Sequence, residues 1–240
     1  MLANKPANPV ITFPESCLTG YFLRREKRFL VEVETNGKRC WVHCNNSGAM
    51  LGLLRPGARV LISPAQGPKR RLPYTLELIR VGDMWVGVNT LTPNRMLRKA
   101  WELSLVPELE PYTHFQSEAR FGASRLDARL TGATGTLWVE AKNVTLVEDG
   151  VAYFPDAVTQ RGQKHLRELI KLARCGCHVA CFYLIQRCDA GCFAPADFID
   201  KEFSTLFWEA HDAGVAVWPY QATVTPEGIG LAHLLPLLKN

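Results

Sequence analysis

Three polar residues near the middle of the chain have the types and the spacing of a site for a hard cation. Asp127 ends the segment Ser124-Arg125-Leu126-Asp127, and Glu140 and Lys142 form a Glu-x-Lys triplet after the glycine-rich break at residues 131–135. Because side chains alternate between the two faces of a strand, Glu140 and Lys142 point the same way, and a hairpin can bring Asp127 opposite Glu140. Two carboxylates beside a lysine suit metal-dependent cleavage of a phosphodiester bond.

The oxygen atoms expected at this position suit a small divalent cation. Magnesium prefers carboxylate and carbonyl oxygens in near-octahedral geometry, and waters complete its coordination. Asp127, Glu140 and the backbone carbonyl of Ala141 can supply three ligands to Mg²⁺ or Mn²⁺. Lys142 can orient the attacking water or hold the scissile phosphate. The alternative is a solvated charged face on an antiparallel hairpin, because Glu-x-Lys triplets arise often by chance.

Two further acidic residues lie close to this motif in the sequence. Glu118 precedes it and can join the catalytic set as a third carboxylate, or form a surface charge opposite Arg120 or Arg125. Asp156 follows the Glu-x-Lys triplet, so it cannot be the first acidic residue of the motif. It can shape a loop, or approach the site from the other side.

Basic residues near the motif are candidates for contact with nucleic acid. Residues 159–165 begin a predicted helix, and the free N–H groups of a helix N-terminus suit a phosphate. Arg161 and Lys164 can strengthen such a site, and Arg125 stands beside the first acidic residue. His165 can act as a base, although a lone histidine is more often structural. The alternative for this segment is an ordinary capped helix start at the surface.

A second basic set belongs to the N-terminal part of the chain. Arg24 and Arg25 form one cluster, and Lys69, Arg70 and Arg71 form another. Several aromatic residues lie beside these clusters in the sequence: Tyr21, Phe22, Phe29, Trp41 and Tyr74. Aromatic side chains on strands next to lysine and arginine make a stacking surface for single strands. The alternative is that the basic loops are only solvated and that several aromatic residues fill a core.

The composition is that of an ordinary soluble protein and leaves room for a nucleic-acid partner. The chain has 240 residues, of which 47% are hydrophobic and 21% charged, enough for two modest domains. No apolar run approaches the roughly 20 residues needed to span a bilayer, and the first residues lack the features of a signal peptide. We therefore expect a cytoplasmic protein without a membrane partner. The net charge of +5 permits nucleic-acid binding.

The eight cysteines are expected to be reduced in that compartment. Five of them gather between Cys175 and Cys192, which raises the question of a zinc site. Structural zinc usually takes two turn-forming pairs, whereas the residues between Cys177 and Cys181 have the pattern of a strand that holds the sulfurs apart. A zinc site is therefore disfavoured.

The N-terminal third has the pattern of a small β-barrel. Strands are predicted at 18–25, 29–34, 38–44, 58–63 and 74–81, separated by turn signals such as Asn36-Gly37 and Pro56-Gly57. The apolar segment 48–54 is expected to form a turn or short helix between the third and fourth strands. This pattern is consistent with an OB-type barrel, an oligonucleotide-binding fold, although an SH3-like barrel has a similar pattern.

The rest of the chain alternates strands and helices. Helices are expected at about 94–104, 162–174 and 200–212, and strands near 113–121, 124–130, 136–143, 178–185 and 215–220. The nearly continuous apolar run at 178–185 is typical of a buried central strand. We expect a two-domain α/β (α+β) protein, with a barrel in residues 1–83 and an α/β domain with a mixed sheet flanked by helices in residues 84–240.

These segments together resemble the sugar fermentation stimulation protein A family of bacteria and archaea. The resemblance spans nearly the whole chain, and the matching stretches are residues 41–44, 68–77, 85–90, 124–127, 140–146, 154–159 and 162–166. It implies an N-terminal OB-fold and a C-terminal restriction-endonuclease-like domain of the P-D…(D/E)-x-K class, with Asp127, Glu140 and Lys142 as its motif residues. It also implies DNA binding and a link to the regulation of sugar (maltose) metabolism.

The chain departs from the family pattern at two places. Ser124-Arg125-Leu126 precedes the first acidic residue without the proline of the motif. After Cys44 the family pattern has Pro-Asn-Thr-Gly-Arg, whereas this chain has Asn-Asn-Ser-Gly-Ala, so Ala49 replaces a basic residue. This replacement puts a phosphate contact on the barrel side in doubt.

The leading interpretation is a DNA-binding, metal-dependent nuclease that cleaves DNA or RNA. One alternative is a non-catalytic nucleic-acid-binding transcriptional regulator on a nuclease scaffold, although the intact Asp127, Glu140 and Lys142 speak against a decayed site. An enzyme of sugar metabolism ranks last, because the sequence has neither a glycine-rich nucleotide loop nor an obvious glycosidase carboxylate pair. The sequence does not determine the oligomeric state, and a homodimer is one arrangement open to it.

Overall fold

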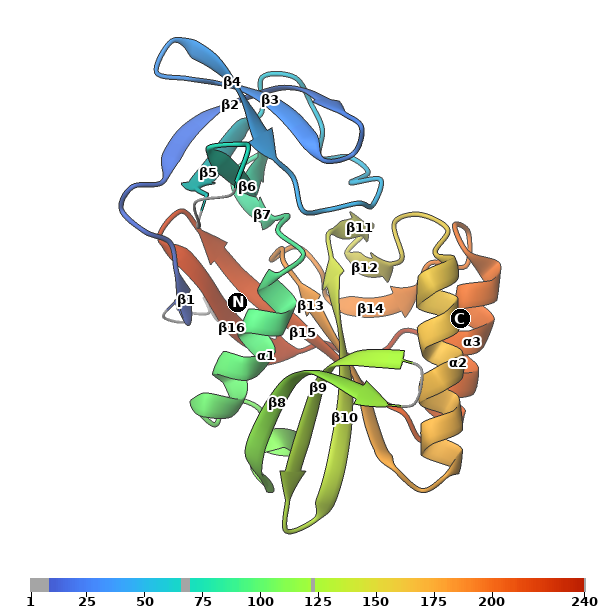
Figure 1. Ribbon diagram of the computed structural model, residues 1–240. Helices are drawn as coiled ribbons and strands as arrows, with labels where there is room; N and C mark the ends of the chain where they lie inside the picture. Colours follow the sequence, from blue (N-terminus) through green and yellow to red (C-terminus); the bar gives the residue numbers. More distant parts are fainter. Residues whose placement is uncertain (1–8, 66–69, 122–123, 240) are drawn as a thin grey trace.

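The chain folds into a β-barrel that stands on one end of a larger mixed sheet (Figure 1). The structure is a computed structural model, and it describes residues 9–65, 70–121 and 124–239. No helix in these ranges is long and apolar enough to cross a membrane.

The barrel is an OB-fold, as the sequence predicts. Its strands are β2 (Leu18–Glu26), β3 (Leu30–Thr35), β4 (Lys38–His43), β5 (Arg59–Pro64), β6 (Tyr74–Val81) and β7 (Met84–Gly87). They pair in the order β4-β3-β2-β5-β6-β7, and the pairing of His43 with Thr75 joins β4 to β6 and closes five strands into a barrel. Alternate residues such as Val31 and Val33 are fully buried because one face of each strand points into the barrel.

The apolar segment between β4 and β5 forms turns rather than a helix. Met50 and Leu53 of this segment are each only 1% exposed and pack into the barrel core. The N–H of Leu53 donates a hydrogen bond of 3.1 Å to the carbonyl of Met50, and the turn that this bond closes brings both side chains to the same core.

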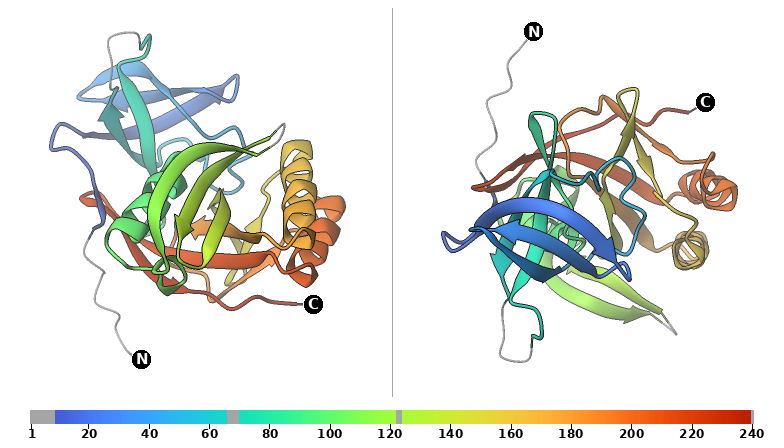
Figure 2. Two further views of the ribbon diagram at one scale, coloured as in Figure 1. Left: turned by 60° about the horizontal axis from the view of Figure 1, so that its bottom comes forward. Right: turned by 90° about the horizontal axis from the view of Figure 1, so that it is seen from above.

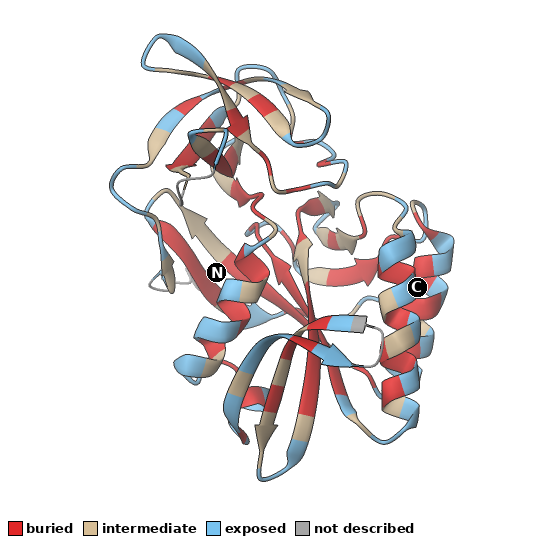
Figure 3. Ribbon diagram, in the orientation of Figure 1, coloured by how far each residue is buried: buried red, intermediate tan, exposed pale blue. Residues whose placement is uncertain are grey.

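The second sheet has seven strands in the order β1-β16-β15-β13-β10-β9-β8. Their bounds are β1 (Ile11–Thr12), β8 (Tyr112–Phe121), β9 (Ser124–Gly132), β10 (Gly135–Val144), β13 (His178–Ile185), β15 (Ala216–Thr225) and β16 (Gly228–Leu234). The β10–β13 and β13–β15 pairs are parallel and the others antiparallel, which makes the sheet mixed. From Val179 to Ile185, β13 is buried on both faces, which explains its apolar run (Figure 3).

In the part of the chain that the structure describes, three α-helices cover the two faces of this sheet. The helix α1 (Thr92–Glu102) packs on one face, and α2 (Gln160–Arg174) and α3 (Lys201–Asp212) lie side by side on the other (Figure 2). A short 3₁₀ helix, η1 (Pro107–Leu109), follows α1. A three-stranded sheet completes the fold with β11 (Leu146–Glu148), β12 (Val151–Phe154) and β14 (Cys192–Pro195).

The two parts of the chain exchange elements at their boundary. The strand β1 precedes the barrel in the sequence but pairs with β16 of the second sheet. The strand β7 begins after the division expected at residues 83 and 84, yet it pairs with β6 of the barrel. The N–H of Gly87, at the end of β7, donates a hydrogen bond of 3.0 Å to the carbonyl of Gln186, just after β13. The barrel is therefore tied to the second part of the chain near both ends of its own segment.

Side chains also join the barrel to the second part. Asp156, in the loop after β12, accepts a hydrogen bond of 2.8 Å from the backbone N–H of Met50. A Cβ atom at Gly48 would lie 2.4 Å from an oxygen of Asp156, so only glycine fits this contact. The side chain of Arg25 binds the backbone carbonyls of Asn46 and Gly48 and holds the same loop from the barrel side.

Asp200 connects the starts of α2 and α3. Its carboxylate accepts hydrogen bonds from the N–H groups of Phe203, in α3, and of Thr159, the N-cap of α2, each 2.9 Å long. The side chain of Gln163 in α2 donates to the same carboxylate. Burial raises the pKa of Asp200, but these donors outweigh it and leave the pKa below its ordinary value.

Replacing Asp200 with alanine should lower the free energy of unfolding by about 2–4 kcal/mol near neutral pH, because a helix cap and a buried charge-assisted hydrogen bond are lost. A carboxylate whose pKa is lowered by folding stabilises the folded state at any pH above its ordinary pKa of 3.8. This stabilisation is lost as the pH falls from that value through the lowered pKa of the folded state. Urea unfolding of the wild type and of Asp200→Asn should therefore differ less at about pH 3 than at about pH 7. An unchanged difference would show that the charge has no role.

Replacing Gly48 with alanine should destabilise the chain by about 1–3 kcal/mol through its clash with the Asp156 carboxylate. The double variant Gly48→Ala/Asp156→Ala should be no less stable than Asp156→Ala alone, because the clash is then relieved. Thermal or urea unfolding of the three variants measures this coupling. Additive losses would place the strain of Gly48→Ala elsewhere.

Candidate active site

Asp127 lies where β9 separates from β10. The antiparallel ladder between these strands ends at the pair Val139–Ala128, and the next residue along β9 is Asp127. Its Oδ2 atom accepts a hydrogen bond of 2.8 Å from the backbone N–H of Ala141, so the side chain takes the place of the missing ladder partner. Its Oδ1 atom accepts one of 2.9 Å from the side chain of Asn94, in the first turn of α1.

Glu140 is almost completely buried on the α2 side of the sheet, with 4% of its side chain exposed. Its Oε1 atom accepts a hydrogen bond of 2.5 Å from Nζ of Lys142 and is also in contact with Nδ1 of His165. Its Oε2 atom is buried and has no hydrogen-bond partner in the described part of the chain. A buried carboxylate oxygen without a partner carries a large desolvation cost, which a bound cation would offset.

The two carboxylates have different pKa shifts. Burial raises the pKa of Glu140, but the charge of Lys142 and the hydrogen bond of His165 outweigh it and bring the pKa down to about 2. Burial also raises the pKa of Asp127, and the nearby charge of Glu140 raises it further, against the opposing hydrogen bond from Ala141. Glu140 is therefore ionised at neutral pH, and its charge acts directly on Asp127.

The residues present fit a small divalent cation. Because the N–H and C=O groups of a strand residue point to the same side, the carbonyl of Ala141 faces the gap that Asp127 borders. Each Asp127 oxygen accepts one hydrogen bond and retains a further lone pair. Within the described ranges no group of three or more His, Cys, Asp and Glu side chains is arranged for a metal. Waters would thus complete the coordination, as Mg²⁺ usually requires.

Glu118 and Asp156 lie away from this cluster. Glu118 has a positive φ of 53°, its side chain is 64% exposed, and it forms a surface ion pair of 3.5 Å with Arg125. Asp156 contacts the barrel loop at Met50. The structure therefore places Glu118 as a surface charge opposite Arg125 and Asp156 as a residue that shapes a loop. The sequence leaves both of these positions open as alternatives to a place in the site.

His165 contacts the motif residues, whereas the sequence pattern gives no more than a weak indication of a place in the site. Its Nδ1 atom contacts Glu140 and lies 3.4 Å from Nζ of Lys142. It stands four residues before the buried Leu169, so it lies along the inward stripe of α2. A polar residue at an inward position is the signal that could have identified it.

The contact of Asn94 with Asp127 has no signal in the sequence, because the two residues are 33 positions apart and no motif joins them. The two residues meet only because α1 packs on the face of the sheet to which Val139 and Ala141 of β10 contribute. The structure thus adds an amide from α1 and an imidazole from α2 to the three motif residues.

The other basic residues of α2 lie at the surface. Arg161 and Lys164 are exposed in its first turns, on the helix that carries His165. Lys164 is only loosely paired, at 3.9 Å from Glu168. The side chain of Thr159 caps the helix by accepting a hydrogen bond from the N–H of Gly162.

The basic residues of the barrel form two groups, one with intramolecular partners and one that is exposed. Arg24 forms ion pairs with Glu26 and Glu32, and Arg25 is held by backbone carbonyls. Arg70 and Arg71 are exposed, whereas Lys69 lies outside the described residues. Intramolecular partners therefore neutralise or occupy the first of the two clusters that the sequence suggests.

Comparison with known proteins agrees with both parts of this architecture. The family model described as the SfsA N-terminal OB domain matches residues 23–88, and that of the sugar fermentation stimulation protein RE domain matches residues 91–228. A sugar fermentation stimulation protein homolog from Syntrophobacter fumaroxidans is 60% identical over 99% of this chain and 91% of its own length. Another from Maridesulfovibrio salexigens is 50% identical over 96% of this chain and 98% of its own length.

A solved structure has the same fold throughout. It is described as that of Pyrococcus furiosus SfsA in complex with Ca²⁺, and it superimposes with a TM-score of 0.91 at 28% identity. The match covers 97% of this chain and all of the other. On these matches, in both domains and over nearly its whole length, the chain belongs to the sugar fermentation stimulation protein (SfsA) family.

Proposed function

We propose that the protein is a metal-dependent nuclease that hydrolyses phosphodiester bonds in DNA or RNA. The observation that carries the proposal is the buried Oε2 atom of Glu140, which has no hydrogen-bond partner in residues 9–65, 70–121 and 124–239 and lies near the carboxylate of Asp127. A lysine and a histidine stand next to the same carboxylate, at Lys142 and His165. This combination suits a reaction in which negative charge develops on a phosphate.

Each residue of the cluster has a role that its contacts support. Asp127, Glu140 and the Ala141 carbonyl would hold Mg²⁺ or Mn²⁺, which when bound polarises the phosphate and lowers the pKa of a coordinated water. Asn94 and the Ala141 N–H fix the orientation of the Asp127 carboxylate. Nζ of Lys142, which donates to Glu140 in this structure, would donate to a phosphate oxygen or to the attacking water. His165 keeps Glu140 and Lys142 in position.

The surroundings of the cluster support a polyanionic substrate. Arg161 and Lys164 are exposed on the helix that carries His165, and Arg125 is exposed on the strand that carries Asp127. On the barrel, Tyr21 and Phe29 are 52% and 47% exposed, and they offer rings on which bases can stack. The Ca²⁺ named for the Pyrococcus furiosus relative is an ion that takes oxygen ligands, the type this cluster supplies.

Purified protein should cleave single- or double-stranded DNA or RNA with Mg²⁺ or Mn²⁺ and lose this activity in EDTA. Asp127→Asn and Glu140→Gln should each reduce the cleavage rate by about 100-fold or more, because each removes a metal ligand. Binding of the uncleaved substrate should survive. Asp149→Asn, which removes a carboxylate exposed at the turn between β11 and β12, is the matched control.

Equal cleavage by the wild type and both site variants would identify a contaminating nuclease. Binding without any metal-dependent cleavage would instead support a nucleic-acid-binding regulator on this scaffold. Glu118→Gln tests the third carboxylate directly. From its exposed position we expect a small effect, and a loss as large as that of Glu140→Gln would place Glu118 in the working site.

Mn²⁺ or Ca²⁺ added to the metal-free protein should raise its melting temperature. At 100 times the dissociation constant, binding stabilises a folded protein by about 2.7 kcal/mol. The shift should disappear in Asp127→Asn and Glu140→Gln and persist in Asp149→Asn. A shift retained by both site variants would place the metal elsewhere.

A further inference from the structure

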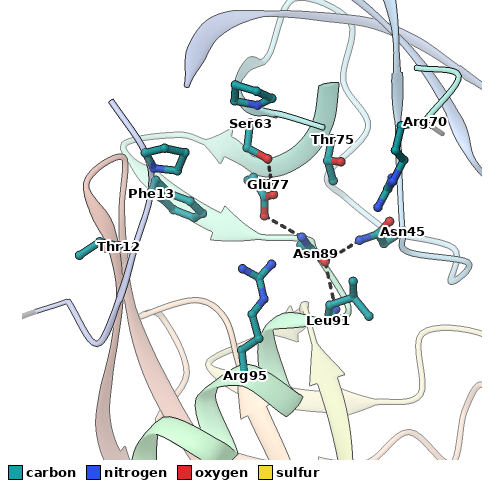
Figure 4. A pocket seen from close by; sticks show the side chains of 12 residues that line it. Thr12, Phe13, Asn45, Ser63, Arg70, Thr75, Glu77, Asn89, Leu91 and Arg95 are labelled. Carbon is teal, nitrogen blue, oxygen red and sulfur yellow. Dashed lines mark hydrogen bonds between the residues drawn. The ribbon is translucent and has the colours of Figure 1, made fainter. Parts of the chain in front are cut away.

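A cavity lies between the barrel and α1, apart from the candidate active site (Figure 4). Its volume is about 310 Å³, which is within the range of sites for small ligands. The barrel contributes Ser63, Thr75 and Glu77 to its wall, and the start of α1 contributes Arg95. Phe13, from the segment that leads into the barrel, lies at one side.

The wall of the cavity is a connected polar network. Oγ of Ser63 donates a hydrogen bond of 2.6 Å to one oxygen of Glu77, and Nδ2 of Asn89 donates one of 2.8 Å to the other. Nδ2 of Asn45 in turn donates to Oδ1 of Asn89 at 2.8 Å. Glu77 and Asn89 are buried, with 5% and 2% exposed. Both oxygens of Glu77 therefore already have donors inside the protein.

Two arginines extend into this cavity from opposite sides. Arg95 enters from α1 and Arg70 from the connection between β5 and β6 (Figure 4). Among the described residues, neither guanidinium group has a carboxylate partner. Two cations thus face a cavity whose one carboxylate, Glu77, is already hydrogen-bonded on both oxygens. This excess of positive charge favours an anionic ligand.

Phosphate is the anion that this geometry suits. A guanidinium group presents its N–H donors in a planar fork that matches two phosphate oxygens at once. The ring of Phe13 can stack on a base, which favours a phosphate carried by a nucleotide over an isolated ion. We propose that this cavity binds a nucleotide phosphate through Arg95 and Arg70.

The position of Arg95 connects this cavity with the candidate active site. Asn94, its neighbour in the first turn of α1, holds the Asp127 carboxylate at 2.9 Å. Oδ1 of Asn89 accepts a hydrogen bond from the N–H of Leu91, just before the same turn. A phosphate on Arg95 is thus bound to the helical turn that orients Asp127. The cavity is a second phosphate subsite for a nucleic-acid strand, an assignment that rests on the proposed nuclease function for its ligand class.

The test is equilibrium binding to the full-length protein in EDTA, so that no cleavage occurs. The ligands are a labelled single-stranded oligonucleotide, a nucleoside 5′-monophosphate, the corresponding nucleoside and inorganic phosphate. Arg95→Ala should weaken the binding of the phosphate-bearing ligands by about 10- to 100-fold, as expected for the loss of a charge-assisted hydrogen bond. Arg95→Lys should recover part of the affinity, because it keeps the charge and loses the fork.

Lys99→Ala is the matched control. It removes one positive charge from the same helix, at an exposed position where the lysine pairs with Glu102. Its effect should stay below about twofold, since a surface charge of this kind contributes little. For the oligonucleotide, the slope of the logarithm of the binding constant against the logarithm of the salt concentration should become less steep by about one unit in Arg95→Ala. Arg95 is exposed, and melting curves verify that its variants are folded.

The outcomes separate the sources of the phosphate. Loss of oligonucleotide affinity in Arg95→Ala supports a strand phosphate, and loss for the mononucleotide alone supports a free nucleotide. Equal effects of Arg95→Ala and Lys99→Ala, equal affinity for nucleoside and monophosphate, or no binding of any phosphate would overturn the proposal. Because Asp127→Asn should keep Arg95-dependent binding in EDTA, failure of the nuclease proposal remains distinguishable from failure of this one.

Discussion

The candidate site depends on one hydrogen bond, in which a side chain takes the place of a backbone partner in the sheet. Where the pairing of β9 with β10 ends, the carboxylate of Asp127 accepts a hydrogen bond from the backbone N–H of Ala141. In a continued ladder a backbone carbonyl of β9 would have accepted this bond. This contact ends the pairing without leaving a buried N–H unsatisfied. It also brings the Asp127 charge next to Glu140, whose Oε2 atom has no partner in the described residues. Two buried carboxylates in this arrangement are unfavourable by themselves, and a cation would relieve their repulsion.

The helices around the sheet hold this arrangement from both faces. On one face α1 brings Asn94 to Asp127, and on the other α2 brings His165 to Glu140. The carboxylate of Asp200 joins the starts of α2 and α3 and so fixes the position of α2. Charged residues that differ in burial therefore have different roles. The buried ones set the electrostatics of the candidate site, and the exposed Arg161 and Lys164 at the start of α2 would contact the polyanion of the proposed function.

Much of the framework follows from local patterns. The apolar run of β13 and the stripes of α2 and α3 appear where the sequence predicts them, because periodicity reports which face of an element is buried. The strands β11, β12 and β14 have only three or four residues each, too few for a period to emerge. The strand β1 has two residues, and its partner β16 stands near the other end of the chain. No local signal can predict such a pairing.

The sequence by itself determined the OB-type barrel, the mixed sheet with flanking helices, and the carboxylates and lysine at Asp127, Glu140 and Lys142. These follow from residue type, spacing and a family pattern that extends over nearly the whole chain. Only the tertiary structure decided that His165 and Asn94 join these residues, that Glu118 faces solvent, and that Arg25 holds a loop. The physical reason is that these contacts form between elements far apart in the sequence, where packing decides which polar groups meet.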